Sequence, residues 1–278
     1  MNWKKKAIVK TIGASINALA LVNTEKAAAK AFDLFCSPRA GQLREKDIVF
    51  LKTATRWIDL SFNNDKIQCY EWEGSGKKVL LAHGWESNSA RWQNLIKSLQ
   101  KADFHIIAID APAHGGSGSA HFHAARYAQF MDVVVKYFQP NHIVGHSVGG
   151  FAMLYFLTDF ENNVEKAISL GAPSDLPRIF ESYWDMMGYS DRVRNAMNEH
   201  FAGIFNKEVS YFRIREIVKS LKTQGMVIHD RGDLICRFAD GEAIHENWEN
   251  SAFMITEKLG HGYQDKKVYH AIRDFLKD

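Results

Sequence analysis

The sequence lacks the features that mark several specialised classes of protein. It holds only 3 cysteines in 278 residues, without C-x-x-C spacing. Cys36, Cys69 and Cys236 cannot all pair, so a reduced, cytoplasmic location is the simpler expectation. No charge of one sign dominates, because the formal net charge is only +3. This balance gives no reason to expect nucleic acid as a partner.

Long hydrophobic runs are also missing, and no stretch reaches the eighteen or so apolar residues of a membrane span. The start, MNWKKKAIVKTIGASINALALV, is basic and then apolar, but Lys10 and Asn17 interrupt it and no convincing cleavage site follows. We expect an amphipathic helix, continued through TEKAAAKAFDLF and packed on the outside of the domain. A membrane-surface helix using Lys4, Lys5, Lys6 and Lys10, or a cleaved signal, are the alternatives.

The rest of the chain alternates short apolar runs with helix-like segments. RWIDLSF and IQCYEWE, joined by the turn NNDK, indicate a hairpin. Five apolar runs follow, each ending at a turn, and most of these turns lead into helix-like segments. The runs are KVLLAHG, FHIIAID, NHIVGHS, KAISLGAP and GMVIHDRGD. Continuous apolar strands alternating with helices predict an α/β fold, with a mostly parallel central sheet flanked by helices on both faces.

One segment, residues 174–222, lacks strand-like runs and reads as two or three helices inserted between sheet strands. We expect an N-terminal helical extension at 1–40, a core at 41–173 and 223–278, and a helical cap at 174–222. The cap is rich in aromatic residues and methionine, either to cover its own apolar face or to roof a hydrophobic pocket. Trp184, Met187 and Phe205 are candidate pocket residues, although the sequence does not say which face of each helix points down.

A serine between glycines follows an apolar strand in HIVGHSVGGF, residues 142–151. A sharp strand-to-helix turn strains its central residue, and glycines two positions away remove Cβ clashes. Gly145, Ser147 and Gly149 therefore indicate a nucleophile elbow, in which the Ser147 hydroxyl is exposed above the strand ends. A packing cluster of glycines is the structural alternative.

A serine nucleophile needs a base, which an acid orients. His261 follows the last strand between two glycines, and Asp233 lies at the far end of the turn after GMVIHD. The order Ser147, Asp233, His261 fits this architecture. Asp230, directly after the same strand, and Asp175, after the preceding strand, are the other candidates for the acid.

A developing negative oxygen needs preorganised N–H donors. We expect one from the backbone of Val148, after the nucleophile, and one from Trp85 in LLAHGWES.

Five motifs in order resemble those of α/β-hydrolase-fold serine hydrolases, from about residue 60 to the end of the chain. AHGWESNSARW is similar to the His-Gly oxyanion segment, IDAPAHGGSG to the Asp-x-x-Gly-x-Gly-x-Ser loop, and GHSVGG to the elbow. IHDRGD and GHGY resemble the acid and histidine turns. Ala113 replaces a family glycine, and Asp230 stands where glycine is frequent.

The resemblance implies acyl chemistry, because dehalogenase- and epoxide-hydrolase-type relatives need aspartate where this chain has Ser147. We expect a serine esterase of small hydrophobic ester or acyl substrates, esterase- or lipase-like, without a cofactor. A thioesterase, a carbon–carbon bond hydrolase and a non-catalytic ligand-binding member of the fold are the alternatives. A metal site is not expected, since the histidine pair HFH at 121–123 lacks a carboxylate motif.

Overall fold

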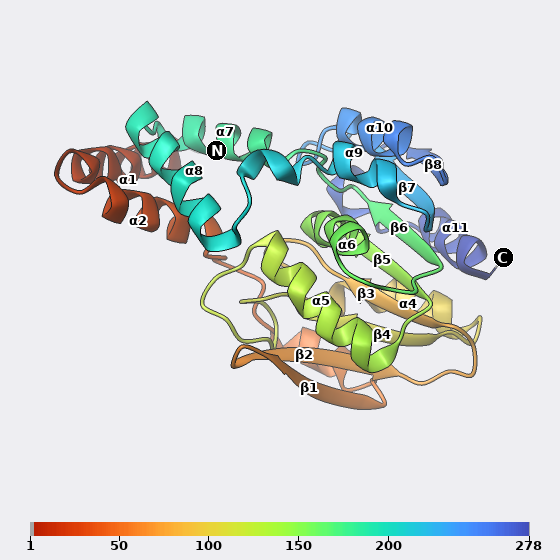
Figure 1. Ribbon diagram of the computed structural model, residues 1–278. Coiled ribbons are helices and arrows are strands. Elements are labelled where there is room, and N and C mark those ends of the chain that lie inside the picture. The colour runs from red at the N-terminus through yellow and green to blue at the C-terminus, as the bar shows by residue number, and fades with distance from the viewer. Residues whose placement is uncertain (1–2, 278) are drawn as a thin grey trace. The chain divides into compact units, whose positions relative to one another are not determined.

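The computed structural model describes residues 3–277, and these contain one eight-stranded sheet (Figure 1). Its order in space is β1-β2-β4-β3-β5-β6-β7-β8. The first three strands in this order pair antiparallel and all later neighbours pair parallel, which confirms the predicted sheet. The strands are β1 (Arg56–Phe62), β2 (Asp65–Trp72), β3 (Lys78–Ala82), β4 (His105–Ile109), β5 (His142–His146), β6 (Lys166–Leu170), β7 (Gln224–Asp230) and β8 (Ser251–Thr256).

β1 and β2 form the predicted hairpin. Asn63 and Asn64 connect them with φ angles of 47° and 66°. Two consecutive residues in the left-handed region are typical of the tight turn that matches strand twist, and asparagine tolerates that region better than most residues do. The turn sets the register, in which Phe62 lies opposite Asp65.

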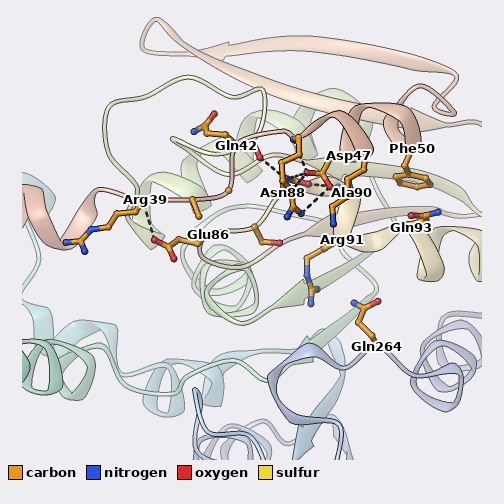
Figure 2. Close-up of a pocket in the computed structure, with 15 residues that line it drawn as sticks. Arg39, Gln42, Asp47, Phe50, Glu86, Asn88, Ala90, Arg91, Gln93 and Gln264 are labelled. Carbon is orange, nitrogen blue, oxygen red and sulfur yellow. Dashed lines mark hydrogen bonds and ion pairs between the residues drawn. The ribbon is translucent and has the colours of Figure 1, made fainter. Parts of the chain in front are cut away.

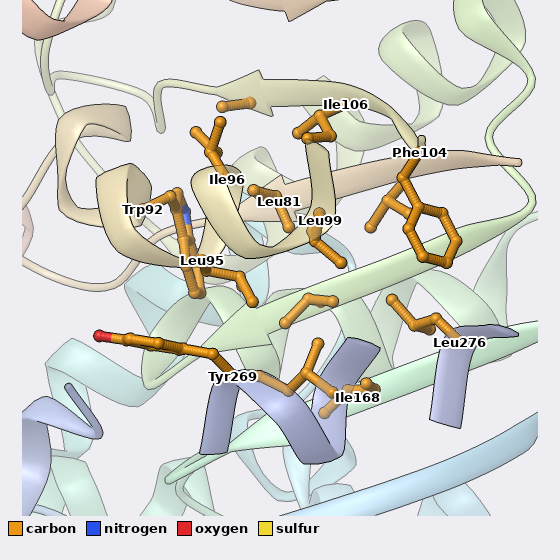
Figure 3. Close-up of a cluster of buried hydrophobic side chains, with 14 of the residues drawn as sticks. Leu81, Trp92, Leu95, Ile96, Leu99, Phe104, Ile106, Ile168, Tyr269 and Leu276 are labelled. Atoms are coloured by element: carbon orange, nitrogen blue, oxygen red, sulfur yellow. The ribbon is translucent and has the colours of Figure 1, made fainter. Parts of the chain in front are cut away.

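Helices cover both faces of the sheet. Helices α5 (Ala124–Phe138) and α6 (Val148–Asp159) contact each other on one face, and α4 (Gln93–Gln100) and α11 (Lys266–Lys277) on the other (Figure 1). Strand side chains such as Leu81 and Ile168 meet Leu95 of α4 and Leu276 of α11 in one buried cluster (Figure 3). Burial on two faces explains why these strands are apolar without alternation. The remaining helices of this part are α3 (Glu45–Leu51), α9 (Ile214–Ile217), α10 (Phe238–Asn247) and the short 3-10 helices η1 (Ser89–Trp92), η3 (Val218–Ser220) and η4 (Gly260–Gly262).

The chain divides into two compact units. The larger contains the sheet and comprises Pro38–Ser174 with Ile214–Asp278; the smaller comprises Met1–Ser37 with Asp175–Arg213. The sequence predicts residues 1–40 and 174–222 as separate segments. In the structure the N-terminal helices share a unit with the inserted helices, and residues 214–222 belong to the larger unit.

The smaller unit consists of helices from two distant parts of the chain: α1 (Trp3–Val22), α2 (Thr24–Cys36), α7 (Leu176–Met187), α8 (Asp191–Phe205) and η2 (Val209–Phe212). α2 lies along α8, and the Phe32 ring is 6.2 Å from that of Phe201. α1 approaches α7 closely, because a Cβ at Gly13 would lie only 1.9 Å from the Met187 carbonyl oxygen. The apolar faces of α7 and α8 thus meet those of α1 and α2.

The N-terminal helix is interrupted once. Asn23 separates α1 from α2, and its side chain accepts a hydrogen bond from the Lys26 N–H at 2.8 Å. None of the helices in the part of the chain that the structure describes combines the length and apolar character needed to cross a membrane. The membrane-surface alternative depends partly on Lys4 and Lys5, whose side chains lie outside the description.

Candidate active site

The predicted site residues of the larger unit follow different strands of the parallel part of the sheet. Ser147 follows β5, Asp233 follows β7 and His261 lies in η4 after β8. Trp85 lies in the loop after β3. Because these strands run parallel, their carboxyl ends share one edge of the sheet, where ligands of open α/β sheets bind.

Ser147 has φ 55° and ψ −127°, the strained turn that the sequence predicts. Its glycine neighbours are required by close backbone approaches. A Cβ at Gly145 would lie 2.6 Å from Gly150 Cα, and one at Gly149 would lie 2.3 Å from the His83 carbonyl oxygen. The glycines therefore let β5 turn into α6 within one residue.

Ser147, His261 and Asp233 form a hydrogen-bonded chain. The Ser147 Oγ lies 2.9 Å from His261 Nε2, and His261 Nδ1 lies 2.7 Å from Asp233 Oδ2. Burial raises the pKa of Asp233, but hydrogen bonds from His261 and from the Cys236 and Ile235 N–H groups outweigh it, so the pKa is lowered. An ionised carboxylate accepts from Nδ1–H, which leaves Nε2 free to accept from the serine hydroxyl.

The other two aspartates considered for the acid are engaged elsewhere. Asp230 accepts from the Thr256 hydroxyl at 2.8 Å and from the backbone N–H groups of Gly232, Leu259 and Gly260. These bonds connect the turn after β7 to the loop after β8. Asp175 lies in the smaller unit, where it accepts from the Arg178 N–H at the start of α7.

Tyr263 is a site residue that the sequence did not reveal. Its hydroxyl donates to Asp233 Oδ2 at 3.0 Å and accepts from the Asp230 N–H at 3.1 Å. The ring is fully buried, and its backbone has φ 53°. Its position two residues after His261 does not by itself predict this contact, because the left-handed backbone at Tyr263 determines where the ring lies.

His146 supports the base through the backbone. Its Nε2–H donates to the His261 carbonyl oxygen at 2.8 Å. Burial lowers the pKa of His146 well below its usual value, and the neighbouring cation Arg91 lowers it further. The ring is therefore neutral at pH 7 and fixes the loop that carries His261.

The loop after β3 passes close to the nucleophile. A Cβ at Gly84 would lie 2.8 Å from Ser147 Cβ. Buried His83 donates from Nδ1 to the Gly84 carbonyl at 2.8 Å and accepts at Nε2 from the Ala111 N–H at 3.0 Å. The Trp85 ring packs edge-to-face against Phe122, with 5.2 Å between centroids.

Val148 is the first residue of α6. N–H groups in the first turn of a helix lack partners within that helix, so the Val148 N–H is available beside Ser147.

Ala113 lies in the loop after β4 and has φ 61°. It occupies the left-handed region without being glycine, which explains why a glycine is the usual residue there.

Of the three candidate pocket residues, Trp184 and Met187 lie in the core of the smaller unit, and Phe205 is partly buried at its edge. Trp184 is 8% exposed, stacks on Phe180 at 5.6 Å and donates to Met197 Sδ at 3.3 Å. Met187 is 5% exposed, and the Phe205 ring lies 4.5 Å from that of Phe201. These contacts account for their apolar character within the smaller unit itself.

Metal-ligating side chains do not gather in the part of the chain that the structure describes: no group of three or more His, Cys, Asp or Glu residues is placed to hold an ion. His123, of the pair in HFH, accepts from the Arg126 N–H and caps α5.

The chain is similar to a family of known sequences and to individual proteins of known activity. The family described as alpha/beta hydrolase fold matches residues 77–202. A pimeloyl-[acyl-carrier protein] methyl ester esterase of Vibrio vulnificus is 26% identical over 163 residues, which cover 55% of this chain and 61% of that protein. The chain thus spans about three fifths of that relative's length.

Solved structures share the fold at low identity. Est1E from Butyrivibrio proteoclasticus, with ferulic acid bound, has a TM-score of 0.66 at 15% identity, covering 79% of this chain and 98% of that one. A meta-cleavage product hydrolase from Pseudomonas fluorescens has a TM-score of 0.60 at 16% identity, covering 79% and 97%.

Proposed function

Because the chain has the α/β-hydrolase fold and resembles serine hydrolases of that fold, we propose that it is a serine esterase. It would cleave a hydrophobic carboxylic ester through an acyl-enzyme. The observation that carries this proposal is the chain of hydrogen bonds from Ser147 through His261 to Asp233.

In this mechanism Ser147 Oγ attacks the ester carbonyl while His261 Nε2 takes its proton. Asp233 keeps Nδ1 protonated and stabilises the imidazolium that forms. His261 then returns the proton to the leaving alcohol, and water deacylates the serine by the reverse sequence. The Tyr263 hydroxyl donates to Asp233 Oδ2, the same oxygen that accepts from His261 Nδ1, so we assign it a positioning role.

Two backbone N–H groups, those of Val148 and Trp85, would stabilise the negative oxygen of the tetrahedral intermediate. In a trans peptide the carbonyl and the next N–H point in opposite directions. The Gly84 carbonyl faces the His83 ring, so the Trp85 N–H faces away from it. The close approach of Gly84 to Ser147 supports a donor at this position.

An ester substrate is favoured by the Vibrio vulnificus relative, a methyl ester esterase. A thioesterase or a carbon–carbon bond hydrolase would use the same three side chains. The solved meta-cleavage product hydrolase shares only the fold and does not decide between them.

The test uses a fluorophosphonate probe and p-nitrophenyl esters of graded acyl length. We expect the wild-type protein to be labelled and to hydrolyse the esters. Ser147→Ala should abolish labelling. It should also lower kcat about 10⁶-fold, leaving only the slow hydrolysis that substrate binding and oxyanion stabilisation still support. An unlabelled, inactive but folded wild-type protein would favour the non-catalytic alternative, and near wild-type turnover in Ser147→Ala would remove Ser147 as nucleophile.

A further inference from the structure

A cavity of the larger unit lies beside the loops that carry Trp85 and His261. Its volume is about 690 Å³, and residues of the segments 39–50 and 86–93 line it together with Gln264 (Figure 2). A cavity of this size accommodates a small organic molecule. Glu86 and Gln264 lie one and three residues beyond Trp85 and His261, so the cavity adjoins the candidate site.

Basic side chains outnumber acidic ones around this cavity. Arg39, Arg44, Lys46 and Arg91 line it, against Asp47 and Glu86. The carboxylate of Asp47 is occupied, because it accepts from the backbone and side chain of Arg44, both at 3.0 Å.

Glu86 offsets only part of the surplus, since four cationic side chains stand against two carboxylates. Its Oε1 accepts from the backbone N–H of Arg39 at 3.0 Å. Within residues 3–277, Arg39, Lys46 and Arg91 form no ion pair with a carboxylate. The cavity therefore carries a positive charge that the protein leaves uncompensated.

Arg91 is the inner cation of the cavity. Figure 2 shows it extending from η1 toward Gln264, and its Nη2 donates to the Gly262 carbonyl at 3.2 Å. The guanidinium lies 4.5 Å from the Trp92 ring centroid. Its Nη1 is buried and has no hydrogen-bond partner among the described residues. Burial lowers the pKa of Arg91 to about 10, so it remains a cation at neutral pH.

A buried cation with an unpartnered donor is unfavourable, and an anion bound beside the guanidinium would offset this cost. A guanidinium presents a planar fork of donors that matches carboxylate and phosphate oxygens. Phe50 and Ala90 add apolar surface to the same cavity, which suits the body of an organic molecule.

We infer that this cavity binds an organic anion, through a carboxylate or phosphate group held by Arg91 with Arg39 and Lys46 at the rim. Resting on the proposed function, the anion would be the charged part of the ester substrate or of its acid product. The Arg91 contact to Gly262 places this group next to the segment that carries His261.

The direct test is calorimetric titration of Ser147→Ala protein with glutarate, with phenyl phosphate and with neutral glutaramide. We expect both anions, or one of them, to bind at least tenfold more tightly than the amide, and the tighter anion identifies the group. Arg91→Gln should weaken that binding about tenfold, the usual effect of losing a charge-assisted hydrogen bond. Arg91→Lys should weaken it less, because the charge is kept.

Controls separate a binding role from a structural one. Lys97→Gln removes an exposed cation of α4 that does not line the cavity, and it should leave anion binding unchanged. Arg39→Gln and Lys46→Gln test the rim without removing the Arg91 contact to Gly262. Equal affinity for glutarate and glutaramide, or anion binding that none of the cavity variants changes, would overturn the inference.

Hydrolysis then separates this inference from the proposed function. We expect wild-type protein to prefer mono-p-nitrophenyl glutarate over p-nitrophenyl pentanoate, and Arg91→Gln to reduce the ratio of the two kcat/KM values. Hydrolysis of the neutral ester without anion binding would refute the cavity alone. Anion binding without any hydrolysis or fluorophosphonate labelling would refute the proposed function alone.

Discussion

Ser147 occupies a backbone conformation that an L-amino acid adopts only where its surroundings enforce it. Such conformations cost about 1–3 kcal/mol. The cost is confined to one residue, because Gly145 and Gly149 have no Cβ to collide with Gly150 Cα and the His83 carbonyl. The strain and the small neighbours together project the hydroxyl toward His261.

Two aspartates three residues apart should behave differently when each is changed to asparagine. Asp233→Asn should lower kcat for p-nitrophenyl esters about 10⁴-fold, since an amide can hold the wrong imidazole tautomer. Asp230→Asn should affect kcat far less. If Asp230→Asn were the more damaging, the acid role would pass to Asp230; if neither mattered, Asp175 would be the next candidate.

The effect of Asp230→Asn should instead appear in stability and depend on pH. Burial raises the pKa of Asp230, but N–H donors such as Leu259 and the Thr256 hydroxyl outweigh it, so the folded pKa lies below its usual value. A lowered pKa stabilises the fold above the unfolded pKa of about 3.9, and this contribution disappears as pH falls through the folded pKa. In denaturant unfolding, the free energy of unfolding of Asp230→Asn should be lower than that of the wild type at pH 7, and this difference should shrink below about pH 4. A deficit that stays constant with pH would mean that the carboxylate charge is unimportant.

At the scale of elements, α7 contributes its aromatic face to the core of the smaller unit. Trp184→Ala should therefore lower stability by about 3–5 kcal/mol, the usual loss for a buried aromatic side chain. Trp184→Phe keeps a ring against Phe180 and should lose much less. Met186→Ala, a change at a 43% exposed position of the same helix, is the matched control. Thermal unfolding measures all three.

The same variants test the expected pocket role of α7. A residue that roofs an acyl pocket changes which chain length is hydrolysed best, at about 0.8 kcal/mol per buried methylene. A stably folded Trp184→Phe protein with a shifted acyl-length optimum would support the pocket role. An unchanged profile, with loss of stability only in Trp184→Ala, would leave Trp184 as a core residue of the smaller unit.

The sequence predicts those secondary-structure elements that neighbouring residues determine by themselves. Asn63 and Asn64 mark the hairpin, and apolar runs with glycine turns mark the parallel strands. Ser147, His261 and Asp233 could be selected because each follows a strand end. The roles of Tyr263 and Arg91 could not be predicted, because they depend on one left-handed backbone and on a contact with a distant loop.

For the whole molecule, the main feature that the sequence does not predict is the packing of the N-terminal helices against the inserted helices. The 3.6-residue periodicity predicts that α2 and α8 are helices with apolar faces. It does not say which face meets which, because their contact joins segments far apart in the chain. The consequence is a second core, in which residues before the sheet and residues within the insertion share one unit.

If that unit is cooperative, a change in α2 should loosen helices that follow more than a hundred residues later. Phe32 is 5% exposed, and its ring lies 6.2 Å from Phe201 and 6.3 Å from Phe205. Phe32→Ala should cost about 3–5 kcal/mol and raise amide hydrogen exchange in α7 and α8 as well as in α2. The amides of β3 and β5 should keep their protection, because their core lies in the larger unit. The control Lys30→Ala, at an exposed position of α2, should change neither the stability nor the amide hydrogen exchange. Faster exchange restricted to α1 and α2 would mean that the N-terminal helices dock on an insertion that is stable without them.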